Sequence, residues 1–354
     1  MTEPKDPLAF DFGVNFQSSA ERVKGEKAAR RALVERQLPF HVQYLDDILR
    51  SILPNDLILL GAETGAGKTE MARIIASSTS ERGKNVFYFA LEAESLEIER
   101  RDKYAILCEL LMKRGRSVVD MNYPDWYRGK CDSIIAGLEQ EAEEIIAEKR
   151  RCLHTYYRGN KFDHKDIQRL FLAINTQADL IILDHLHYVD IEDENENRGF
   201  KTTIKMIRDV ALGISKPVIL IAHLRKRDGK QKRIVPHIED FHGSSDIIKI
   251  VTHSVMLAPA TKMPSSSPHI SNTYIYVPKD RHGGATGLVA LCRFDRNRKT
   301  YEKHYTLGRP DGDEFVPLDL NEVPRWAKHH KPLTEQAPTF QVQPEDDQRE
   351  WGMQ

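Results

Sequence analysis

The sequence predicts an α/β fold with a mostly parallel sheet, helices on both faces of that sheet, and additional strands toward the C-terminus. From about residue 40 to residue 305, unbroken apolar runs alternate with helical stretches, a pattern typical of parallel strands buried on both faces. After about residue 250 the pattern turns to strands, which predicts further strands in the C-terminal part.

The apolar runs and their breaks define the individual elements. Strands are expected at residues 56–61, 86–91, 154–157, 180–184, 217–222, 253–257, 273–277, 287–294 and 300–305. Helices are expected at residues 68–80, over most of 95–151 with a break near 122–124, and from about residue 163. The runs LIILD at 180–184 and PVILIA at 217–222 are unbroken, so these two strands are expected to be fully buried.

Composition divides the chain into a polar segment with a linker helix at 1–39, a domain at 40–306 and a tail at 307–354. The helix expected at 20–36 has few apolar residues and cannot fold alone. It is either a solvated helix that leads into the domain or a helix that docks on a neighbouring subunit. The tail holds six of the 17 prolines and an acidic end, and is expected to be flexible.

The bulk composition excludes several classes of protein. Net charge is −1, so any surface that attracts nucleic acid must be local. The four cysteines form no CxxC pair, which disfavours a zinc or disulfide framework and favours a reducing compartment. The chain has no signal-peptide pattern and no apolar run near 18 residues, so we expect a cytoplasmic protein that does not contact a membrane.

The strongest motif is a glycine-rich loop between the expected strand 56–61 and the expected helix 68–80. It comprises Gly61, Ala62, Glu63, Thr64, Gly65, Ala66, Gly67, Lys68 and Thr69. Backbone N–H groups and a helix N-terminus can surround a triphosphate when glycines permit close approach. Lys68 can reach the β- and γ-phosphates, and Thr69 can ligate Mg²⁺. The loop therefore predicts binding of ATP with Mg²⁺, although Ala62 stands where the usual motif begins with glycine.

Three further residues lie at the expected carboxyl ends of strands, where an open α/β sheet binds its ligand. Asp184 ends the run ADLIILD and is expected to hold Mg²⁺; the alternative is an aspartate that caps a helix or lies in a loop. Glu92 follows the second strand and could activate water as a general base, but spacing alone does not distinguish it from Glu94. His223 ends PVILIAH and either senses the γ-phosphate or is structural.

A basic loop follows His223 directly. Six of its nine residues are cationic: Arg225, Lys226, Arg227, Lys230, Lys232 and Arg233. The loop is either a solvated surface segment or a phosphate-binding loop for nucleic acid. It contains no aromatic residue for base stacking, so contact would be to the nucleic-acid backbone and independent of sequence.

Other histidines are interpreted as structural. Asp184, His185 and His187 have a spacing that suggests a metal site, but no matching set of ligands is in register elsewhere. His237 and His242 are likewise expected to be structural.

In their order along residues 40–305, these motifs resemble the DnaB-like hexameric replicative helicases, a family of RecA-like P-loop ATPases. LPNDLILLGAETGAGKTEMARIIA resembles the phosphate loop of the family, and VFYFALEAESLEIERR resembles its strand ending in Ser-Leu-Glu. ADLIILDHLHYVD, PVILIAHLRKR and VPKDRHGGATG resemble its magnesium strand, its sensor strand and its Lys-x-Arg-x-Gly element.

The resemblance implies roles for particular residues. Glu92 would be the catalytic carboxylate, Asp184 would hold Mg²⁺, and His223 would be the sensor, with the next loop facing single-stranded DNA. Lys279 and Arg281 would reach across a subunit interface to the γ-phosphate of a neighbour, which implies a ring, expected to be a hexamer. One segment departs from the pattern: His242 stands where the family has Arg, and Ser245 stands where it has Gly.

Two functions follow as hypotheses. The first is an ATP-dependent helicase or translocase on single-stranded DNA, a stand-alone motor from the replication system of a phage, plasmid or mobile element, with possible loader or replication partners. The second is a non-helicase RecA-like ATPase that acts as a nucleotide-switched assembly factor, such as a recombination mediator, loader or defence component. The basic loop favours the first, and the altered segment around His242 favours the second.

Overall fold

The computed structural model describes residues 18–63, 65–119, 121–130, 133–191, 196–224, 233–241, 246–265, 267–283 and 286–333. Within these residues, ten strands form one sheet in the order β10-β9-β8-β7-β6-β1-β5-β4-β2-β3. The strands are β1 (Leu57–Ala62), β2 (Val86–Ala90), β3 (Leu153–Tyr157), β4 (Leu180–Asp184), β5 (Val218–His223), β6 (His253–Pro259), β7 (Ile270–Asp280), β8 (Val289–Asp295), β9 (Thr300–Asp311) and β10 (Glu314–Pro317).

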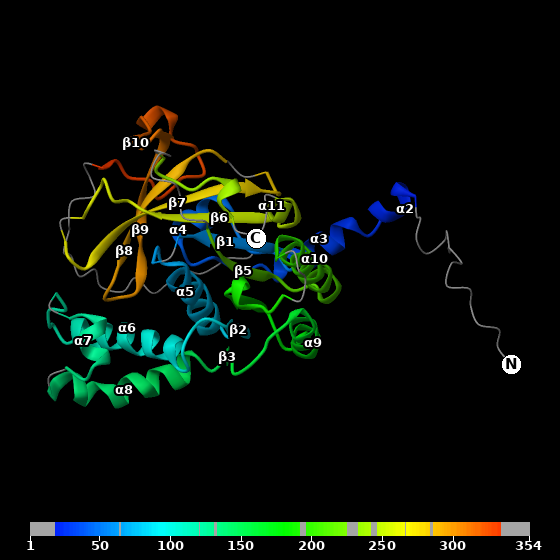
Figure 1. The fold of residues 1–354 in the computed structure, drawn as a ribbon. Coiled ribbons are helices and arrows are strands. Elements are labelled where there is room, and N and C mark those ends of the chain that lie inside the picture. The colour runs from blue at the N-terminus through cyan, green and yellow to red at the C-terminus, as the bar shows by residue number, and fades with distance from the viewer. Residues whose placement is uncertain are drawn as a thin grey trace.

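The described helices connect and cover these strands (Figure 1). The α-helices are α2 (Ser19–Val23), α3 (Glu26–Glu35), α4 (Gln43–Ile48), α5 (Lys68–Glu81), α6 (Glu97–Lys113), α7 (Tyr123–Tyr127), α8 (Ser133–Lys149), α9 (His164–Ile174), α10 (Glu196–Ile214) and α11 (Asp246–Ile250). Short 3-10 helices are η1 (Leu186–Tyr188), η2 (Ile238–Asp240) and η3 (Leu320–Glu322). Among the helices of the described ranges, none is long and apolar enough to cross a bilayer.

The sheet has a parallel half and an antiparallel half, where the sequence predicts a mostly parallel sheet with additional C-terminal strands of unspecified direction. Strands β6, β1, β5, β4, β2 and β3 are parallel neighbours, and β6 to β10 pair antiparallel. Strand β1 is central and carries the phosphate loop at its carboxyl end. The α/β class with added C-terminal strands is therefore confirmed.

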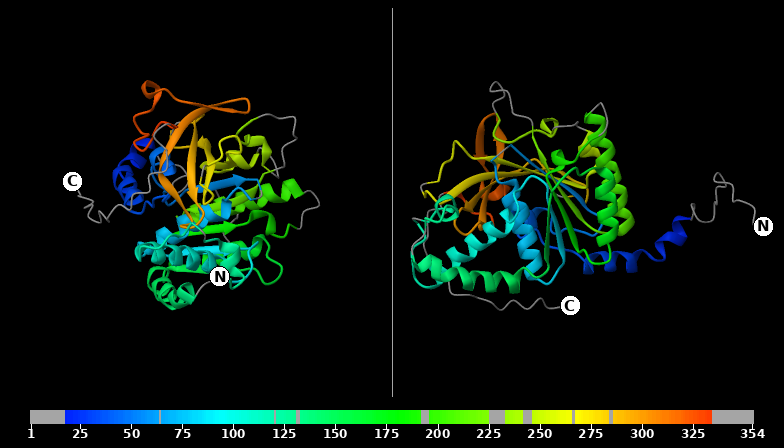
Figure 2. Two further views of the ribbon diagram at one scale, coloured as in Figure 1. Left: turned by 90° about the vertical axis from the view of Figure 1, so that its left-hand side faces the viewer. Right: turned by 60° about the horizontal axis from the view of Figure 1, so that its bottom comes forward.

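Alternate residues of the central strands supply two separate hydrophobic cores, because successive side chains on a strand point to opposite faces. On one face, Ile58 and Leu60 of β1 pack with α4 and α5. On the other face, Leu57 and Leu59 pack with α9, α10 and α11. Figure 2 shows the sheet between these two layers. Both faces of β1 are thus covered, which explains its unbroken apolar sequence.

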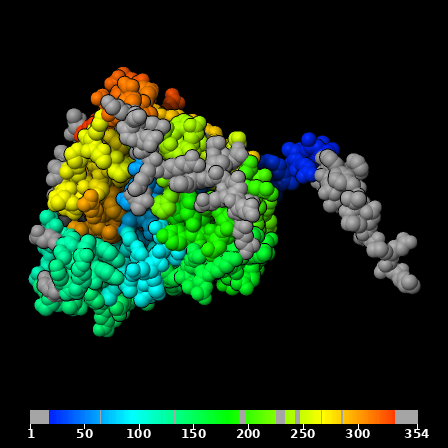
Figure 3. Space-filling model, viewed as in Figure 1, coloured from blue at the N-terminus to red at the C-terminus, as the bar shows by residue number. Residues whose placement is uncertain are grey.

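A third core lies apart from the sheet. Helices α6, α7 and α8 bury their own cluster, centred on Leu107, Leu138 and Ala142. They form the lobe at the lower left of Figures 1 and 3.

The N-terminal helix is interrupted and exposed. The sequence predicts one helix at 20–36, but the structure has α2 and α3, separated at Lys24 and Gly25. Neither helix buries any residue, and both project away from the body of the molecule (Figures 1 and 3).

The prediction of a flexible tail from residue 307 is wrong for residues 307–333. Strand β9 continues to Asp311, and a turn at Gly312, with φ of 56°, leads into β10. Leu318 and Ala327 are buried against the core that also contains α4. Gly312 and Asp313 form the two-residue turn of this hairpin, which composition alone does not indicate. The domain therefore continues at least to residue 333, and residues 334–354 lie outside the described part of the chain.

Candidate nucleotide-binding site

The glycine-rich loop joins β1 to α5 in a backbone conformation that depends on its glycines. Gly65 has φ of 81° and Gly67 has φ of 92°, both in the left-handed region that favours glycine. Gly67 is the N-cap of α5, so the loop leads directly into the N-terminus of a 14-residue helix. Thr64 lies outside the described residues. This arrangement presents backbone N–H groups and a helix N-terminus, as anion binding requires.

Gly61 is required for packing. A Cβ at Gly61 would overlap the ring of Phe241 and would lie 3.2 Å from Cδ2 of Leu224. Both neighbours belong to the segment that follows β5, and Leu224 and Phe241 form a bridge. The glycine before Ala62 therefore allows this segment to lie against the end of β1.

Lys68 is buried and its ammonium group faces the loop. Nζ donates to the carbonyl oxygens of Ala62 at 2.9 Å and Glu63 at 3.1 Å, and it lies 3.1 Å from Nδ1 of His223. Burial lowers the pKa of Lys68, while the nearby carboxylates of Glu92 and Asp184 act in the opposite direction. The ammonium group is thus held at the carboxyl edge of the sheet.

Asp184 provides a buried carboxylate beside Thr69. Its Oδ2 accepts a hydrogen bond from the Tyr88 hydroxyl at 2.5 Å. Its Oδ1 is buried and accepts no hydrogen bond of good geometry from the described residues. Burial raises the pKa of Asp184 to about 6, whereas Tyr88, Thr69 and Lys68 lower it. A buried carboxylate oxygen without a strong donor, next to a threonine hydroxyl, fits a hard divalent cation such as Mg²⁺.

Glu92 and His223 meet at the same edge, from the ends of β2 and β5. Oε2 of Glu92 lies 3.8 Å from Nε2 of His223. Burial raises the pKa of Glu92, and the Lys68 ammonium opposes this shift. Glu92 and Glu94 are both exposed, but in the described part of the chain only the Glu92 carboxylate is paired with His223 and acts on Lys68. The geometry therefore favours Glu92 over Glu94, a choice that spacing could not make.

His185, which the sequence pattern leaves as a structural residue, lies against His223 at this site. Its ring is fully buried, with its centroid 3.7 Å from that of His223. Burial lowers the pKa of His185 to about 2, and the charges of His223, His187 and Lys68 lower it further. Donor atoms of Glu92, His185 and His223 lie within 4.8 Å of one another. Because the Lys68 ammonium is 3.1 Å from His223, a second cation there would be repelled.

Lys279 and Arg281 lie at the opposite end of the sheet from the phosphate loop. In the register of β1 and β6, Ala62 is opposite Leu257, whereas the first residue of β6, His253, is opposite Ile58 and Asp280. At about 3.3 Å per strand residue, Arg281 is on the order of 15 Å from the loop of its own chain. Nζ of Lys279 donates to the carbonyl oxygen of Ile248, and Arg281 is exposed.

The residues expected to contact DNA fall largely outside the described part of the chain. Residues 225–232 are outside the described part, and they include Arg225, Lys226, Arg227, Lys230 and Lys232. Residues 242–245, which include His242 and Ser245, are also outside it. Arg233 is described, and its guanidinium pairs with Asp240 at 2.9 Å.

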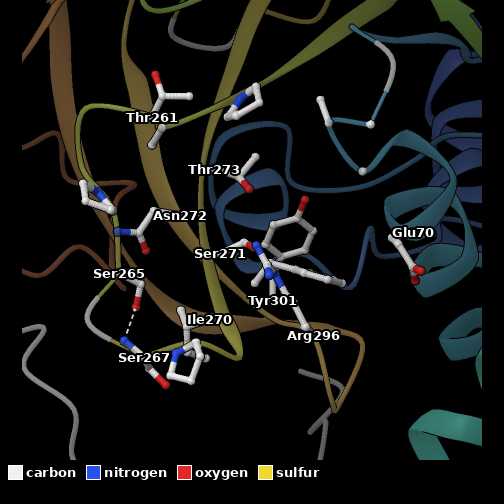
Figure 4. Close-up of a pocket in the computed structure, with 18 of the residues that line it drawn as sticks. Glu70, Thr261, Ser265, Ser267, Ile270, Ser271, Asn272, Thr273, Arg296 and Tyr301 are labelled. Carbon is white, nitrogen blue, oxygen red and sulfur yellow. Dashed lines mark hydrogen bonds between the residues drawn. The ribbon is translucent and has the colours of Figure 1, made fainter. Parts of the chain in front are cut away.

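A cavity of about 620 Å³ adjoins the phosphate loop (Figure 4). Gly65, Ala66 and Gly67 line one side, and Tyr301 and Arg296 from the antiparallel half line another. Its volume falls in the range of small-molecule sites. The site that sequence motifs predict at the loop is therefore continuous with a cavity formed by strands β7, β8 and β9.

Comparisons with known proteins agree with the fold. The family described as "DnaB-like helicase C terminal domain" matches residues 38–303. A search of curated proteins finds no match. A solved structure described as an "ATPase Domain" has a TM-score of 0.64 and 15% identity, covering 81% of this chain and 99% of its own. "The Structure Of A DnaB-Like Replicative Helicase And Its Interactions With Primase" has a TM-score of 0.62 and 15% identity, covering 81% and 67%.

Proposed function

The chain belongs to the DnaB-like helicase C-terminal domain family, and on that premise we propose that it is an ATP-dependent helicase or translocase. It moves along single-stranded DNA as a homo-oligomeric ring, expected to be a hexamer, in DNA replication. The observation that carries this proposal is the convergence of Lys68, at the N-terminus of α5, with Asp184, Glu92 and His223, which lie at or just after the carboxyl ends of β4, β2 and β5. These groups supply the positioning and the charge that phosphoryl transfer to water requires.

Each residue of the site would have a separate role in ATP hydrolysis. Lys68 would leave the carbonyl oxygens of Ala62 and Glu63 and bind the terminal phosphates. Thr69 and Asp184 would hold Mg²⁺, which screens the negative charge of the phosphate oxygens. Glu92 would orient and deprotonate the attacking water, since a pKa above the ordinary value makes its carboxylate a stronger base.

His223 and Arg281 would connect each site to DNA and to the next subunit. His223 contacts Lys68 and precedes the basic loop at 225–233, so a change at the phosphate reaches the loop through one side chain. Arg281 of one copy would stabilise charge on the nucleotide of the next, because it lies too far from the loop of its own chain. A homo-oligomer is therefore part of the proposal.

Strand displacement tests the proposal. The purified chain, given ATP and Mg²⁺, should separate a forked DNA duplex, and single-stranded DNA should stimulate its hydrolysis of ATP. Lys68→Ala should abolish both activities, and Lys165→Ala, which changes an exposed lysine on α9, should retain them. Hydrolysis without displacement or DNA stimulation would contradict the helicase assignment and favour a nucleotide-switched assembly factor.

A further inference from the structure

A second cluster of ligating side chains lies at the end of the sheet that faces away from the phosphate loop. It comprises Asp56, which precedes β1, His253, which begins β6, and His282, which follows β7. Each residue offers one donor atom, and the three atoms lie within 4.8 Å of one another. Pairing of β6 with both β1 and β7 brings these three segments together.

The donor atoms already have the spacing of a metal site. Oδ1 of Asp56 lies 3.3 Å from Nε2 of His253 and 3.1 Å from Nε2 of His282. Ligand atoms about 2.0–2.1 Å from a tetrahedral Zn²⁺ ion are separated by about 3.3 Å. A metal could therefore occupy the centre of the cluster with little movement of the side chains.

His253 is oriented as a metal ligand usually is. Its ring is 1% exposed, and neither ring nitrogen makes a hydrogen bond of good geometry in the described structure. Its Nδ1 faces Oδ1 of Asp280 at 2.9 Å, which leaves Nε2 directed at the cluster. Histidine ligands commonly direct their second nitrogen at a carboxylate in this way, which fixes the ring and its tautomer.

The charges and the access route also suit a divalent ion. Asp56 and Asp280 bring two carboxylates to the cluster, and the cations Arg208 and Arg281 partly offset them. Oδ2 of Asp56 accepts a hydrogen bond from the Leu53 N–H at 2.7 Å, which holds the carboxylate in place. The His282 side chain is 50% exposed, so solvent can reach the site and supply a fourth ligand.

We propose that Asp56, His253 and His282 bind a divalent transition metal, of the class of Zn²⁺, with Asp280 orienting His253. Two imidazoles and one carboxylate favour such an ion over Mg²⁺ or Ca²⁺, which prefer oxygen ligands. Arg281 lies between Asp280 and His282, so the metal fastens the turn that carries Arg281 to the start of β1. Binding itself stands without the proposed function; only this consequence for Arg281 rests on it.

A simpler arrangement would be a buried ion triad in which a protonated His253 bridges Asp56 and Asp280. That arrangement accounts for the two carboxylates, but it leaves His282 directed at the same Asp56 oxygen. In that arrangement His253 carries protons on both ring nitrogens and a neutral His282 donates its Nε2–H to Asp56, whereas a metal would take a lone pair from Nε2 of each imidazole. The two arrangements differ in whether a metal binds.

Cobalt titration of the full chain, after chelation and without nucleotide, tests the proposal. We expect about one equivalent of Co²⁺ with the visible absorption of a four-coordinate site, competed by Zn²⁺. His282→Ala should weaken Co²⁺ binding by more than about 100-fold, and Asp280→Asn by about 10–100-fold. His237→Ala, which changes an exposed histidine elsewhere, should leave binding unchanged.

Two outcomes would overturn the proposal. One is a chelated protein that binds no Co²⁺ at micromolar concentration, which is the result expected of an ion triad. The other is unchanged binding in His282→Ala, which would assign the metal to a different cluster such as Glu92, His185 and His223. Circular dichroism confirms that each variant is folded, and Asp280→Asn provides a second test if His282→Ala is not. Because ATP is absent, failure here leaves the helicase proposal intact.

Discussion

Glu92 and Glu94 are two residues apart, yet only one faces the candidate phosphate site. We expect Glu92→Gln to lower ATP hydrolysis by about 10²–10⁴-fold, because the amide cannot accept the proton of the attacking water. Nucleotide affinity should remain, since Lys68 and the glycine-rich loop are unchanged. Steady-state hydrolysis and binding of a fluorescent nucleotide measure the two effects. Glu94→Gln is the matched control, and an equal loss in that variant would contradict the assignment.

The same carboxylate predicts a pH dependence. Burial raises the pKa of Glu92 above its ordinary value of 4.5, so the basic form is lost as pH falls through a value higher than 4.5. Hydrolysis by the wild-type chain should decline on this acid side. The residual rate of Glu92→Gln should show no such decline, because glutamine does not titrate. The two pH profiles together therefore identify the group that titrates.

The buried carboxyl group of Asp184 is expected to lower the free energy of unfolding at neutral pH. Its pKa is about 6 in the folded chain and 3.8 without burial, so folding favours the protonated form. Its contribution is favourable at acid pH and is lost as pH rises through about 6. When the pH is raised from about 4.5 to 7 without Mg²⁺, the free energy of unfolding of the wild type should fall by about 2 kcal/mol more than that of Asp184→Asn. Urea unfolding at both pH values measures this, and parallel losses would contradict it.

The sequence could identify these residues, but it could not predict the contacts between their side chains. Each lies at the carboxyl end of an apolar run, so the common edge of the sheet was predictable for Lys68, Asp184, Glu92 and His223. The proximity of His185 to this site was not predicted, because a histidine after a strand has no distinguishing pattern. Its position against the ring of His223 depends on the pairing of β4 with β5, which one sequence does not reveal.

At the scale of elements, most strands were predictable because their sequences are unbroken and apolar. Strand β9 shows the limit, because its last three residues, 309–311, are exposed and have no apolar pattern. After the hairpin, Leu318 and Ala327 are buried in a core formed by residues far away in the sequence. Such contacts join segments far apart in sequence, and composition gives no sign of them.

Helix α3 has no packing role within the described chain, and this predicts the effect of removing it. Deleting residues 1–36 should leave the thermal unfolding midpoint within a few degrees, because α2 and α3 bury no residue. Exposed apolar side chains such as Val34, at 48%, would instead contact a neighbouring copy. Light scattering should therefore show loss of assembly. A deletion that assembles normally would support the alternative of a solvated linker helix.

At the scale of the whole molecule, the two proposed sets of catalytic groups, Lys68 with Glu92 and Arg281, lie at opposite ends of one sheet. Arg281→Ala should lower hydrolysis by about 10³–10⁵-fold while nucleotide affinity stays nearly constant. Mixing Arg281→Ala and Lys68→Ala subunits should restore activity, up to about a quarter of the sites in random rings, because an intact Lys68 can then meet an intact Arg281. A matched mixture of Lys68→Ala with Glu92→Gln subunits should restore none, since both residues serve the same side of the interface.

The register of β1, β6 and β7 also implies that the rate of ATP hydrolysis depends on the concentration of the chain. A single copy holds Lys68 and Arg281 at opposite ends of one sheet. If Arg281 acts in trans as proposed, an isolated copy would bind nucleotide but would lack a complete hydrolytic site. Turnover per molecule should therefore rise with protein concentration and level off once encounters are saturated. At low concentration, newly synthesised copies would therefore not hydrolyse ATP, and hydrolysis would begin only where the local concentration allows copies to associate.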